Sequence, residues 1–493
     1  MYMRTDPQSL AVSAELLASG LFGKAVERYF FKLSLKSKIA MQSLGGIALR
    51  TVRSSQAIYL RSAVCYYSSS SDKSSYKCVV LGGGAGGCAM ASKMARKFGA
   101  GHVAVVEPKD DSVSKNSLLP ADVHPGGLWH KTIADSRQPM GKSIPKNAKW
   151  IKDSVASVDP DNNLVTTSAG LQLEYEMLIV AVGLQLDFSK IKGSIEALQK
   201  DPRVCSNYSP DYVHKTYQAF KAFPKSGGTA IFTMPVMPIK CPGAPQKIMY
   251  LFDDYLRTND KREGSKILYN TNLPVIFGVK KYANALLEVV EERGLTVNFQ
   301  HNLVEVDHTK GEATFAKVGL DPVETVTMSY DLLHIAPPMS APDFLKGSPL
   351  ANEAGYVDVS KEHLQHNKYE NVFAIGDCSS APTSKTAAAV AAESGILSNT
   401  IDAYLKGQKP SGLEYDGYTS CPLITKGGKT ILAEFDYNAQ PLETFPINQG
   451  KERRTMWHLK KDFMPFLYWN MLIRGHWHGP RIFRKLLHLG MGK

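Results

Sequence analysis

Two cysteines of the chain stand where a thiol could take part in redox chemistry. Cys241 lies between prolines and a glycine in the stretch IKCPGAPQKIMY, where a predicted strand gives way to a predicted helix. Cys378 ends the stretch NVFAIGDC, a second predicted strand that leads into a loop. If both loops face one crevice, the two thiols could form a disulfide that a nucleophile opens, releasing a thiolate. The alternative is that each cysteine is a small residue tolerated in a loop.

The surroundings of Cys378 favour a reactive thiol. A helix is predicted shortly after it, in SKTAAAVAAESGIL, and Lys385 lies in that segment. A helix N-terminus and a nearby ammonium group both stabilise a thiolate, so we expect a lowered pKa for Cys378. The other cysteines are assigned as follows: Cys65 to an N-terminal targeting segment, Cys78 and Cys88 to the core, and Cys205 and Cys421 to no function, with a structural role favoured.

A βαβ unit in residues 76–108 could position a redox cofactor. Its first strand is predicted at Lys77–Leu81, its helix extends to Phe98, and its second strand is predicted at His102–Val106. The strand, glycine-rich turn and helix follow one another in the order that dinucleotide-binding folds require. The unit therefore predicts a bound dinucleotide.

The turn of this unit carries the pattern Gly-x-Gly-x-x-Gly, formed by Gly82, Gly84 and Gly87. Gly82 permits a tight turn, Gly84 lets the backbone approach a pyrophosphate, and Gly87 allows close packing of helix and strand. The helix N-terminus would bind the phosphates. Glu107 ends the second strand, where a carboxylate would accept the ribose hydroxyls.

Two further strand ends indicate that the dinucleotide is FAD. The stretch LIVAVGLQLD predicts a strand ending near Gly183, and NVFAIGDC predicts one ending in Gly376 and Asp377. Asp377 could bond the ribityl chain of a flavin, and the next helix N-terminus could stabilise negative charge on the reduced ring. We assign Lys385 to the same cofactor site. Together these motifs resemble the flavoprotein disulfide reductase superfamily, which has two dinucleotide-binding domains.

A second Rossmann-like unit is predicted after residue 228, without the loop that would bind a nucleotide. Its predicted elements are strand Thr229–Thr233, helix Gln246–Leu256, strand Lys266–Tyr269, helix Tyr282–Arg293 and strand Thr296–His301. The first junction reads PVMPIKCPGAP, and Asn270 stands where a ribose-binding acid is expected. Without successive glycines the backbone cannot close on a pyrophosphate, which disfavours a nicotinamide donor. We therefore expect electrons to enter through Cys241.

Several longer stretches resemble the sulfide:quinone oxidoreductases of animal mitochondria. They are IKCPGAPQKIMY, IFGVKKYANAL, LHIAPPMSAPD, NVFAIGDCSSAPTSKTAAAVAAES, YDGYTSCPL, LAEFDY and MPFLYWNMLIRG, and the resemblance extends over about residues 76–491. It implies that hydrogen sulfide attacks a Cys241–Cys378 bridge. Cys378 would take the persulfide, and Cys241 would become the thiolate that faces the flavin. The resemblance also implies that the flavin reduces ubiquinone and that the sulfane sulfur leaves to glutathione or sulfite.

The expected fold class is α/β, with two Rossmann-like domains and a C-terminal amphipathic region. We expect these boundaries: a presequence at 1–75, a discontinuous FAD domain at 76–225 and 331–410, a degenerate NAD-type domain at 226–330, and a C-terminal region at 411–493. The last region, in DFMPFLYWNMLIRGHWHGPRIFRKLLHLGMGK, places aromatic and apolar residues at helical spacing among basic ones. Such helices suit the surface of a membrane, here the inner mitochondrial membrane; packing against the protein's own core is the alternative.

The composition is that of an ordinary globular protein, with 43% hydrophobic and 21% charged residues. The net charge of +12 comes from basic residues concentrated at the two ends, which argues against a nucleic-acid footprint. We predict no metal site. No apolar run of about 18 residues occurs, so a spanning helix is not expected. Residues 30–71 are basic and serine-rich and contain no Asp or Glu, as in a mitochondrial presequence; a disordered tail is the alternative, and Met41 is a candidate start.

One stretch departs from the family pattern. Residues 117–131, SLLPADVHPGGLWHK, stand where the family has a segment of the form HYYQPxFTLVGxG near the flavin. A one-nucleotide shift of reading frame would restore that segment, so we interpret it as a frame or splice error in the sequence record; real divergence is the alternative. Two other functions stay open: a type II NADH:quinone dehydrogenase, which needs a glycine-rich loop near 234–243, and a flavoprotein without catalytic activity.

Overall fold

The computed structural model describes residues 73–113 and 136–490, all within one compact unit. They form a mixed α/β fold with two Rossmann-like sheets, which confirms the predicted fold class. The presequence lies outside the described residues except for Lys73–Ser75, which form the start of the first strand. The atypical segment 117–131 also lies outside them.

The first sheet is built around two neighbouring strands, β1 and β8, whose last four residues are buried. Its order, given by hydrogen-bonded neighbours, is β5 (Lys149–Ile151), β2 (Val103–Val106), β1 (Lys73–Leu81), β8 (Gln172–Val180), β7 (Leu164–Thr167) and β6 (Val155–Asp159), and β19 (Val372–Ala374) also pairs with β8. The strands β5, β2, β1, β8 and β19 run parallel. The ends of β1, β8 and β19 therefore meet at one edge.

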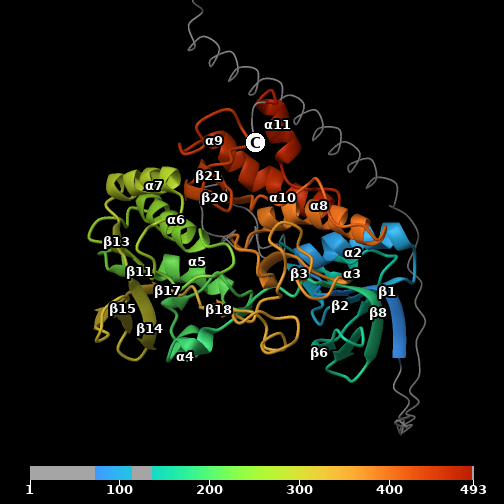
Figure 1. The fold of residues 1–493 in the computed structure, drawn as a ribbon. Helices are drawn as coiled ribbons and strands as arrows, with labels where there is room; N and C mark the ends of the chain where they lie inside the picture. The colour runs from blue at the N-terminus through green and yellow to red at the C-terminus, as the bar shows by residue number, and fades with distance from the viewer. Residues whose placement is uncertain (1–72, 114–135, 491–493) are drawn as a thin grey trace, which may run out of the picture. The chain divides into compact units, whose positions relative to one another are not determined.

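The second sheet is also parallel and is covered by helices. Its order is β10 (Val204–Cys205), β17 (Leu332–His334), β11 (Thr229–Met234), β12 (Lys266–Thr271) and β13 (Thr296–Asn298). Helices α6 (Ala244–Thr258) and α7 (Lys280–Glu292) follow β11 and β12 in the chain (Figure 1). Two of its strands lie outside the range 226–330 expected for this domain, and the domain boundaries remain a prediction.

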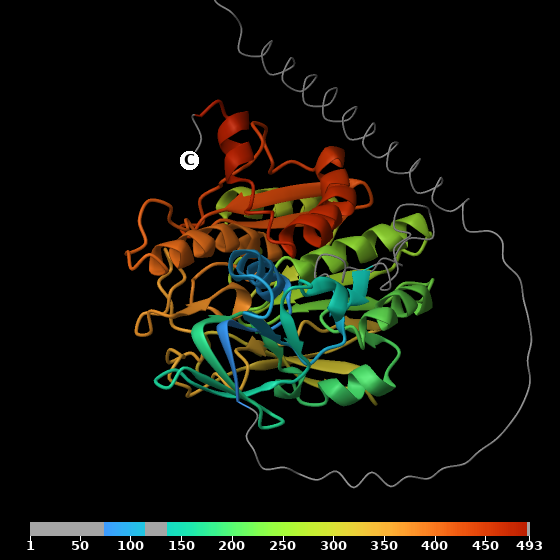
Figure 2. The same cartoon turned by 90° about the vertical axis from the view of Figure 1, so that its right-hand side faces the viewer.

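The C-terminal region adds a hairpin and a run of short helices. The hairpin pairs β20 (Thr419–Lys426) with β21 (Lys429–Phe435), and β20 packs against α6. The helical turns are α9 (Arg454–His458), a π-helical turn at Leu459–Phe463, α10 (Met464–Leu467), a π-helical turn at Tyr468–Leu472 and α11 (Arg481–Leu487). Figure 2 shows these turns gathered beside the hairpin. Within residues 73–113 and 136–490, no helix is long and apolar enough to cross a bilayer.

The predicted elements agree with the structure apart from their ends. The first unit consists of β1, α2 (Ala85–Phe98) and β2, as the glycine pattern predicted. The long helix α8 (Ala387–Tyr404) occupies the small-residue stretch after Cys378. The strand β1 begins four residues before the predicted Lys77, because Lys73–Tyr76 pair with Gln172–Tyr175 of β8. That pairing is long-range, and no local pattern encodes it.

The close packing of α2 on β1 generates a test of stability. A Cβ on Gly87 would lie 1.8 Å from the carbonyl oxygen of Gly82, a backbone atom that cannot move aside, whereas a Cβ on Gly84 would meet nothing within 4 Å. We expect Gly87→Ala to lower the free energy of unfolding by about 3 kcal/mol or more. Denaturant unfolding measures it, with Gly84→Ala as the matched control. Equal stability of the two variants would contradict this packing.

Candidate active site

The glycine-rich turn between β1 and α2 leaves an open backbone surface. Gly82 has a φ of 97°, and a Cβ there would lie 2.5 Å from the carbonyl oxygen of Ala181. Gly84 caps α2 without a side-chain hydrogen bond, and a Cβ on it would extend into free space. The first amide groups of α2 are therefore not capped by a side chain, as a helix that binds a pyrophosphate requires.

Glu107 lies beside this turn, as its position after β2 predicted. One carboxylate oxygen accepts a hydrogen bond from the amide of Gly83 at 2.7 Å, and the other accepts one from the amide of Lys109 at 2.9 Å. Each carboxylate oxygen can accept more than one hydrogen bond, so these contacts orient Glu107 and leave acceptor capacity for a ribose hydroxyl. The turn, the uncapped helix and this carboxylate fit the adenosine diphosphate half of FAD.

The strand ends that were assigned to the flavin lie next to one another. The amide of Ile375 donates to the carbonyl oxygen of Val180 at 3.0 Å, which joins the end of β19 to the end of β8. Gly183 and Gly376 both have positive φ, 72° and 79°. Asp377 follows Gly376 in a short 3₁₀ turn and is buried. The two turns meet at the edge of the sheet that the glycine-rich turn also occupies.

Glu393 of α8 supports the second of these turns, and the sequence did not single it out. One carboxylate oxygen accepts a hydrogen bond from the amide of Gly376 at 2.7 Å. The other oxygen is buried, without a partner among the described residues. Burial raises the pKa of Glu393 to about 7. Through its hydrogen bond with the Gly376 amide, the Glu393 carboxyl group fixes the backbone of the Gly376–Asp377 turn.

Cys378 does not lie where the sequence placed it. Its side chain is fully buried, and its sulfur faces the carbonyl oxygens of Val180 and Ile375 at 3.5 and 3.7 Å. Burial raises its pKa to about 11, which contradicts the lowered pKa that we expected from the helix start and Lys385. The described contacts of Cys378 tie two loops of the first domain together and do not include Cys241.

The structure instead brings Cys421 to Cys241. The side chains of Cys421 and Cys241 are hydrogen-bonded to each other. Cys421 comes from the middle of β20, where it pairs with Ala433 and is buried. Gly243, the N-cap of α6, makes this approach possible, because a Cβ on it would lie 2.2 Å from the Cys421 sulfur. The predicted pair Cys241–Cys378 is thus replaced by the pair Cys241–Cys421.

Two buried lysines act on the pair of thiols. The Lys247 Nζ atom lies 3.5 Å from the Cys241 sulfur, and the charge of Lys460, in the π-helical turn at Leu459–Phe463, also favours a thiolate on the pair. Both side chains are nearly inaccessible to solvent, at 2% and 4% exposure. The hydrogen bond with Cys421 and the charge of Lys247 hold the pKa of Cys241 well below its usual range, although burial opposes them.

The two thiols therefore differ in acidity. The hydrogen bond with Cys241 and burial raise the pKa of Cys421 above its usual range. Burial acts to lower the pKa of Lys247, but the charges of Cys241 and Cys421 and the hydrogen bond to Cys241 together raise it above its usual range. The arrangement stabilises a thiolate on Cys241 and a neutral thiol on Cys421. In a disulfide between them, Cys241 would be the better leaving group.

The backbone at Cys241 is unusual. Its φ is 51°, a left-handed conformation that side chains other than glycine rarely adopt. The amide of Cys241 donates to the carbonyl oxygen of Lys385 at 2.8 Å, and its own carbonyl oxygen accepts from the Tyr208 hydroxyl at 3.3 Å. These contacts hold a strained residue in place, as is frequent at reactive sites.

Lys385 links this junction to the loop after Cys378. Its Nζ atom donates to the carbonyl oxygens of Ser379 and Ala381 at 2.8 and 2.9 Å. Its backbone oxygen accepts from Cys241, so one residue contacts both loops. Its ammonium group is buried, and burial lowers its pKa. These contacts place Lys385 as a connector between the two domains; its assignment to the cofactor remains a prediction.

The second domain offers no site for a nucleotide ribose at the predicted position. Asn270, at the end of β12, is fully buried, accepts from the side-chain amide of Asn298 at 2.8 Å and donates to the Met328 sulfur at 3.4 Å. The junction of β11 and α6, where a phosphate loop would lie, holds Cys241. That this is a degenerate NAD-type domain remains a prediction.

Cys421 was missed because its local sequence resembles core. It lies in the strand TSCPLITK, whose residues are buried except for the last, and nothing local distinguishes its thiol from a small apolar side chain. A signal was present in the stretch YDGYTSCPL, one of those that carry the family resemblance. Lys247 and Lys460 were missed for a similar reason, since a lysine on an amphipathic helix is ordinarily exposed.

Comparison with known proteins finds relatives that match most of the chain. Residues 76–213 match the family described as pyridine nucleotide-disulphide oxidoreductase. The chain is 52% identical to the mitochondrial sulfide:quinone oxidoreductase of Mus musculus over 85% of this chain and 91% of the mouse protein. It is 42% identical to the Dictyostelium discoideum protein of the same name over 82% and 87% of the two chains.

A solved structure shares the fold at lower identity. The sulfide:quinone oxidoreductase of Aquifex aeolicus superposes with a TM-score of 0.68 at 18% identity, covering 85% of this chain and 95% of that one. At that identity the likeness concerns the fold alone. The family rests on the close relatives, which match along most of both chains. On that basis the chain belongs to the family of mitochondrial sulfide:quinone oxidoreductases.

Proposed function

We propose that the protein oxidises hydrogen sulfide, reduces ubiquinone and uses Cys241 and Cys421 as its redox pair. The observation that carries the proposal is the contact between these two thiols beside Lys247. The family membership supports sulfide and quinone as the substrates. The fit of the glycine-rich turn and Glu107 supports FAD as the cofactor.

The acidity of the two cysteines assigns their roles. In the oxidised enzyme, hydrosulfide attacks the Cys421 sulfur, forms a persulfide there and displaces Cys241 as a thiolate. This direction is favoured because Lys247 stabilises the leaving thiolate, and a thiol of low pKa leaves faster. A nucleophilic acceptor then removes the outer sulfur and leaves a thiolate on Cys421. FAD, when bound, accepts the two electrons released as the disulfide re-forms and delivers them to ubiquinone.

The sulfur acceptor proposed is a small anion, glutathione or sulfite. The ammonium groups of Lys247 and Lys460 support it, because they lie at the pair of thiols and would attract negative charge. The charges of Lys247 and Lys460 both act on Cys241, and both charges are positive.

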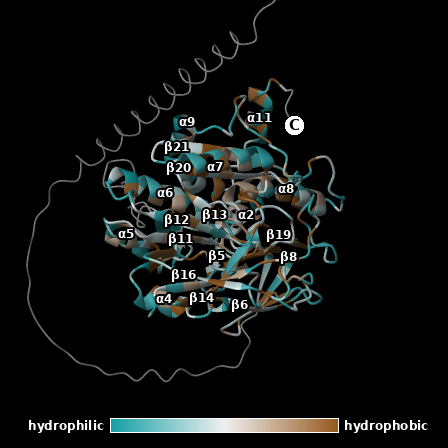
Figure 3. Cartoon of the chain, turned by 90° about the vertical axis from the view of Figure 1, so that its left-hand side faces the viewer, coloured by the Kyte–Doolittle hydropathy of each residue, from teal (hydrophilic) through white to brown (hydrophobic). Residues whose placement is uncertain are grey.

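The membrane is proposed to bind the C-terminal helix α11. Its side chains Ile482, Phe483 and Leu486 are 78%, 46% and 70% exposed, and Leu489 beyond it is 83% exposed. Figure 3 shows the hydrophobic colouring of α11. A helix with exposed apolar residues beside arginine and lysine suits the surface of a bilayer. A lipid-soluble acceptor such as ubiquinone agrees with this placement, and the relatives' mitochondrial names support the inner mitochondrial membrane.

Three serine variants test the redox pair. We expect Cys241→Ser and Cys421→Ser each to slow the sulfide-dependent bleaching of flavin absorbance by about a hundredfold or more, because either change removes the disulfide. Cys378→Ser is the matched control and should bleach at the normal rate. Purified protein in detergent with a short-chain ubiquinone provides the assay. Loss of bleaching in Cys378→Ser but not in Cys421→Ser would reject the pair, and bleaching by NADH alone would favour a type II dehydrogenase.

The role of Lys247 generates a prediction about pH. Because the pKa of Cys241 is lowered, its thiolate persists as the pH falls below the ordinary thiol range and is lost only near the lowered value. In Lys247→Met we expect the thiolate to disappear at a higher pH. The rate of alkylation of Cys241 in reduced protein, followed against pH by mass spectrometry, measures this change. Lys261→Met, which also alters a buried lysine of this domain, is the control; identical profiles would exclude the role.

The exposed face of α11 can be tested separately. We expect Ile482→Asp with Leu486→Asp to weaken binding to phosphatidylcholine vesicles by roughly a hundredfold or more, since two large apolar side chains leave the bilayer. Co-sedimentation measures the binding. Leu320→Asp with Val323→Asp, which alters two exposed apolar residues elsewhere, is the control. Unchanged sedimentation of the α11 variant would show that another surface binds the membrane.

A further inference from the structure

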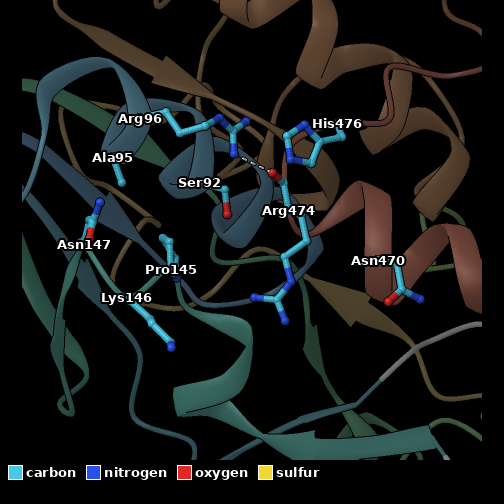
Figure 4. Close-up of a pocket in the computed structure, with 9 residues that line it drawn as sticks. All are labelled: Ser92, Ala95, Arg96, Pro145, Lys146, Asn147, Asn470, Arg474 and His476. Carbon is cyan, nitrogen blue, oxygen red and sulfur yellow. Dashed lines mark hydrogen bonds between the residues drawn. The ribbon is translucent and has the colours of Figure 1, made fainter. Parts of the chain in front are cut away.

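A basic hollow lies between α2 and residues 470–476, which we call the C-terminal strap. Figure 4 shows its lining side chains, and its volume is about 330 Å³. Four of the lining residues carry or can carry positive charge: Arg96, Lys146, Arg474 and His476. Asn147 and Asn470 add amide groups, and none of the described residues that line it is acidic. The hollow was not among the sites expected from the sequence.

The hollow is held open by hydrogen bonds between α2 and the strap. The Arg96 guanidinium donates to the carbonyl oxygens of Arg474 and Gly475 at 2.7 and 3.1 Å. The Ser92 hydroxyl donates to the carbonyl oxygen of Ile473 at 2.9 Å. These hydrogen bonds fix the backbone of the strap relative to α2. The positions from which its basic side chains extend are therefore fixed as well.

Within residues 73–113 and 136–490, no ion pair neutralises Lys146 or Arg474 of the hollow. Lys97 of α2, by contrast, pairs with Asp402 at 2.6 Å. Like charges gathered without counter-charges repel one another, and a bound anion would remove that repulsion. An arginine beside a lysine is well suited to phosphate, which both can bind through charged hydrogen bonds.

The strap continues directly into the apolar face of α11. Trp477 follows His476 and packs against Phe483 of α11, with ring centroids 5.8 Å apart. The side chain of Ile482, next in the chain to Phe483, is exposed. A phosphate bound in the hollow would thus be attached to a strap whose next residues carry the apolar surface proposed to enter a bilayer.

We propose that this hollow binds the phosphate group of an anionic phospholipid. The inference rests on the proposed membrane association and adds to it a specific headgroup site. Free phosphate has the same chemistry, but the exposed apolar residues of α11 beside the strap favour a phosphate that carries acyl chains. Anionic lipids attract basic residues near a bilayer surface, each with roughly a fivefold effect on binding.

The test compares vesicles of pure phosphatidylcholine with vesicles that also contain phosphatidylglycerol. For the double variant Lys146→Gln with Arg474→Gln, we expect about a 30-fold loss of binding to the anionic vesicles and no change for the neutral ones. The control, Lys225→Gln with Lys280→Gln, removes the same charge from the second domain and should lose much less. If the double variant unfolds or loses flavin, Lys146→Gln alone replaces it, since that side chain is exposed.

Each outcome bears on the proposal. Equal losses in the variant and the control would show a general effect of charge and would overturn the site. Stabilisation of the wild type by inorganic phosphate, absent in the double variant, together with unchanged vesicle binding, would assign the hollow to a soluble anion and overturn the lipid. Sulfide-dependent bleaching in detergent, recorded on the same proteins, separates a failure of the proposed reaction from a failure of this site.

Discussion

The active site depends on a positive charge held inside the protein beside a thiol. Lys247 is buried, and its Nζ atom lies 3.5 Å from the Cys241 sulfur. A buried ammonium group is unfavourable unless an opposite charge or good acceptors compensate for the lost water. A thiolate on Cys241 provides that compensation, and the lysine in turn makes the thiolate stable. Neither charge would be tolerated here alone, so the pair accounts for both the low pKa of Cys241 and the burial of Lys247.

This constraint explains how the second domain was adapted. In a Rossmann-like unit the junction of the first strand and helix approaches a pyrophosphate, and the helix N-terminus favours negative charge. Here the same junction carries Cys241 with a left-handed backbone, held by the carbonyl oxygen of Lys385 and the Tyr208 hydroxyl. The junction of β11 and α6, which in a nucleotide-binding unit would favour a phosphate, here favours the thiolate of Cys241. The glycine retained at the start of α6, Gly243, serves the approach of Cys421.

The sequence predicted what depends on neighbours in the chain. The glycine-rich turn, Glu107 and the strand ends near Gly183 and Gly376 follow local patterns, and each occupies its expected place. The partner of Cys241 depends on how β20 packs against α6, about 180 residues away in the chain, and no local pattern encodes that contact. Cys378 was chosen because it follows a motif, yet its sulfur is directed into the domain that the motif builds.

The C-terminal region completes the catalytic pair and also carries the proposed membrane surface. It supplies Cys421 from β20, Lys460 from a π-helical turn, and the exposed apolar side chains of α11. A π-helical turn re-aims the side chains that follow it, and such turns are frequent at functional sites. A region that only anchored the protein would have no need to bury a lysine beside the thiols. Its docking therefore decides whether Cys241 has a partner at all, and the proposed attachment to the membrane and the proposed chemistry depend on the same packed segment.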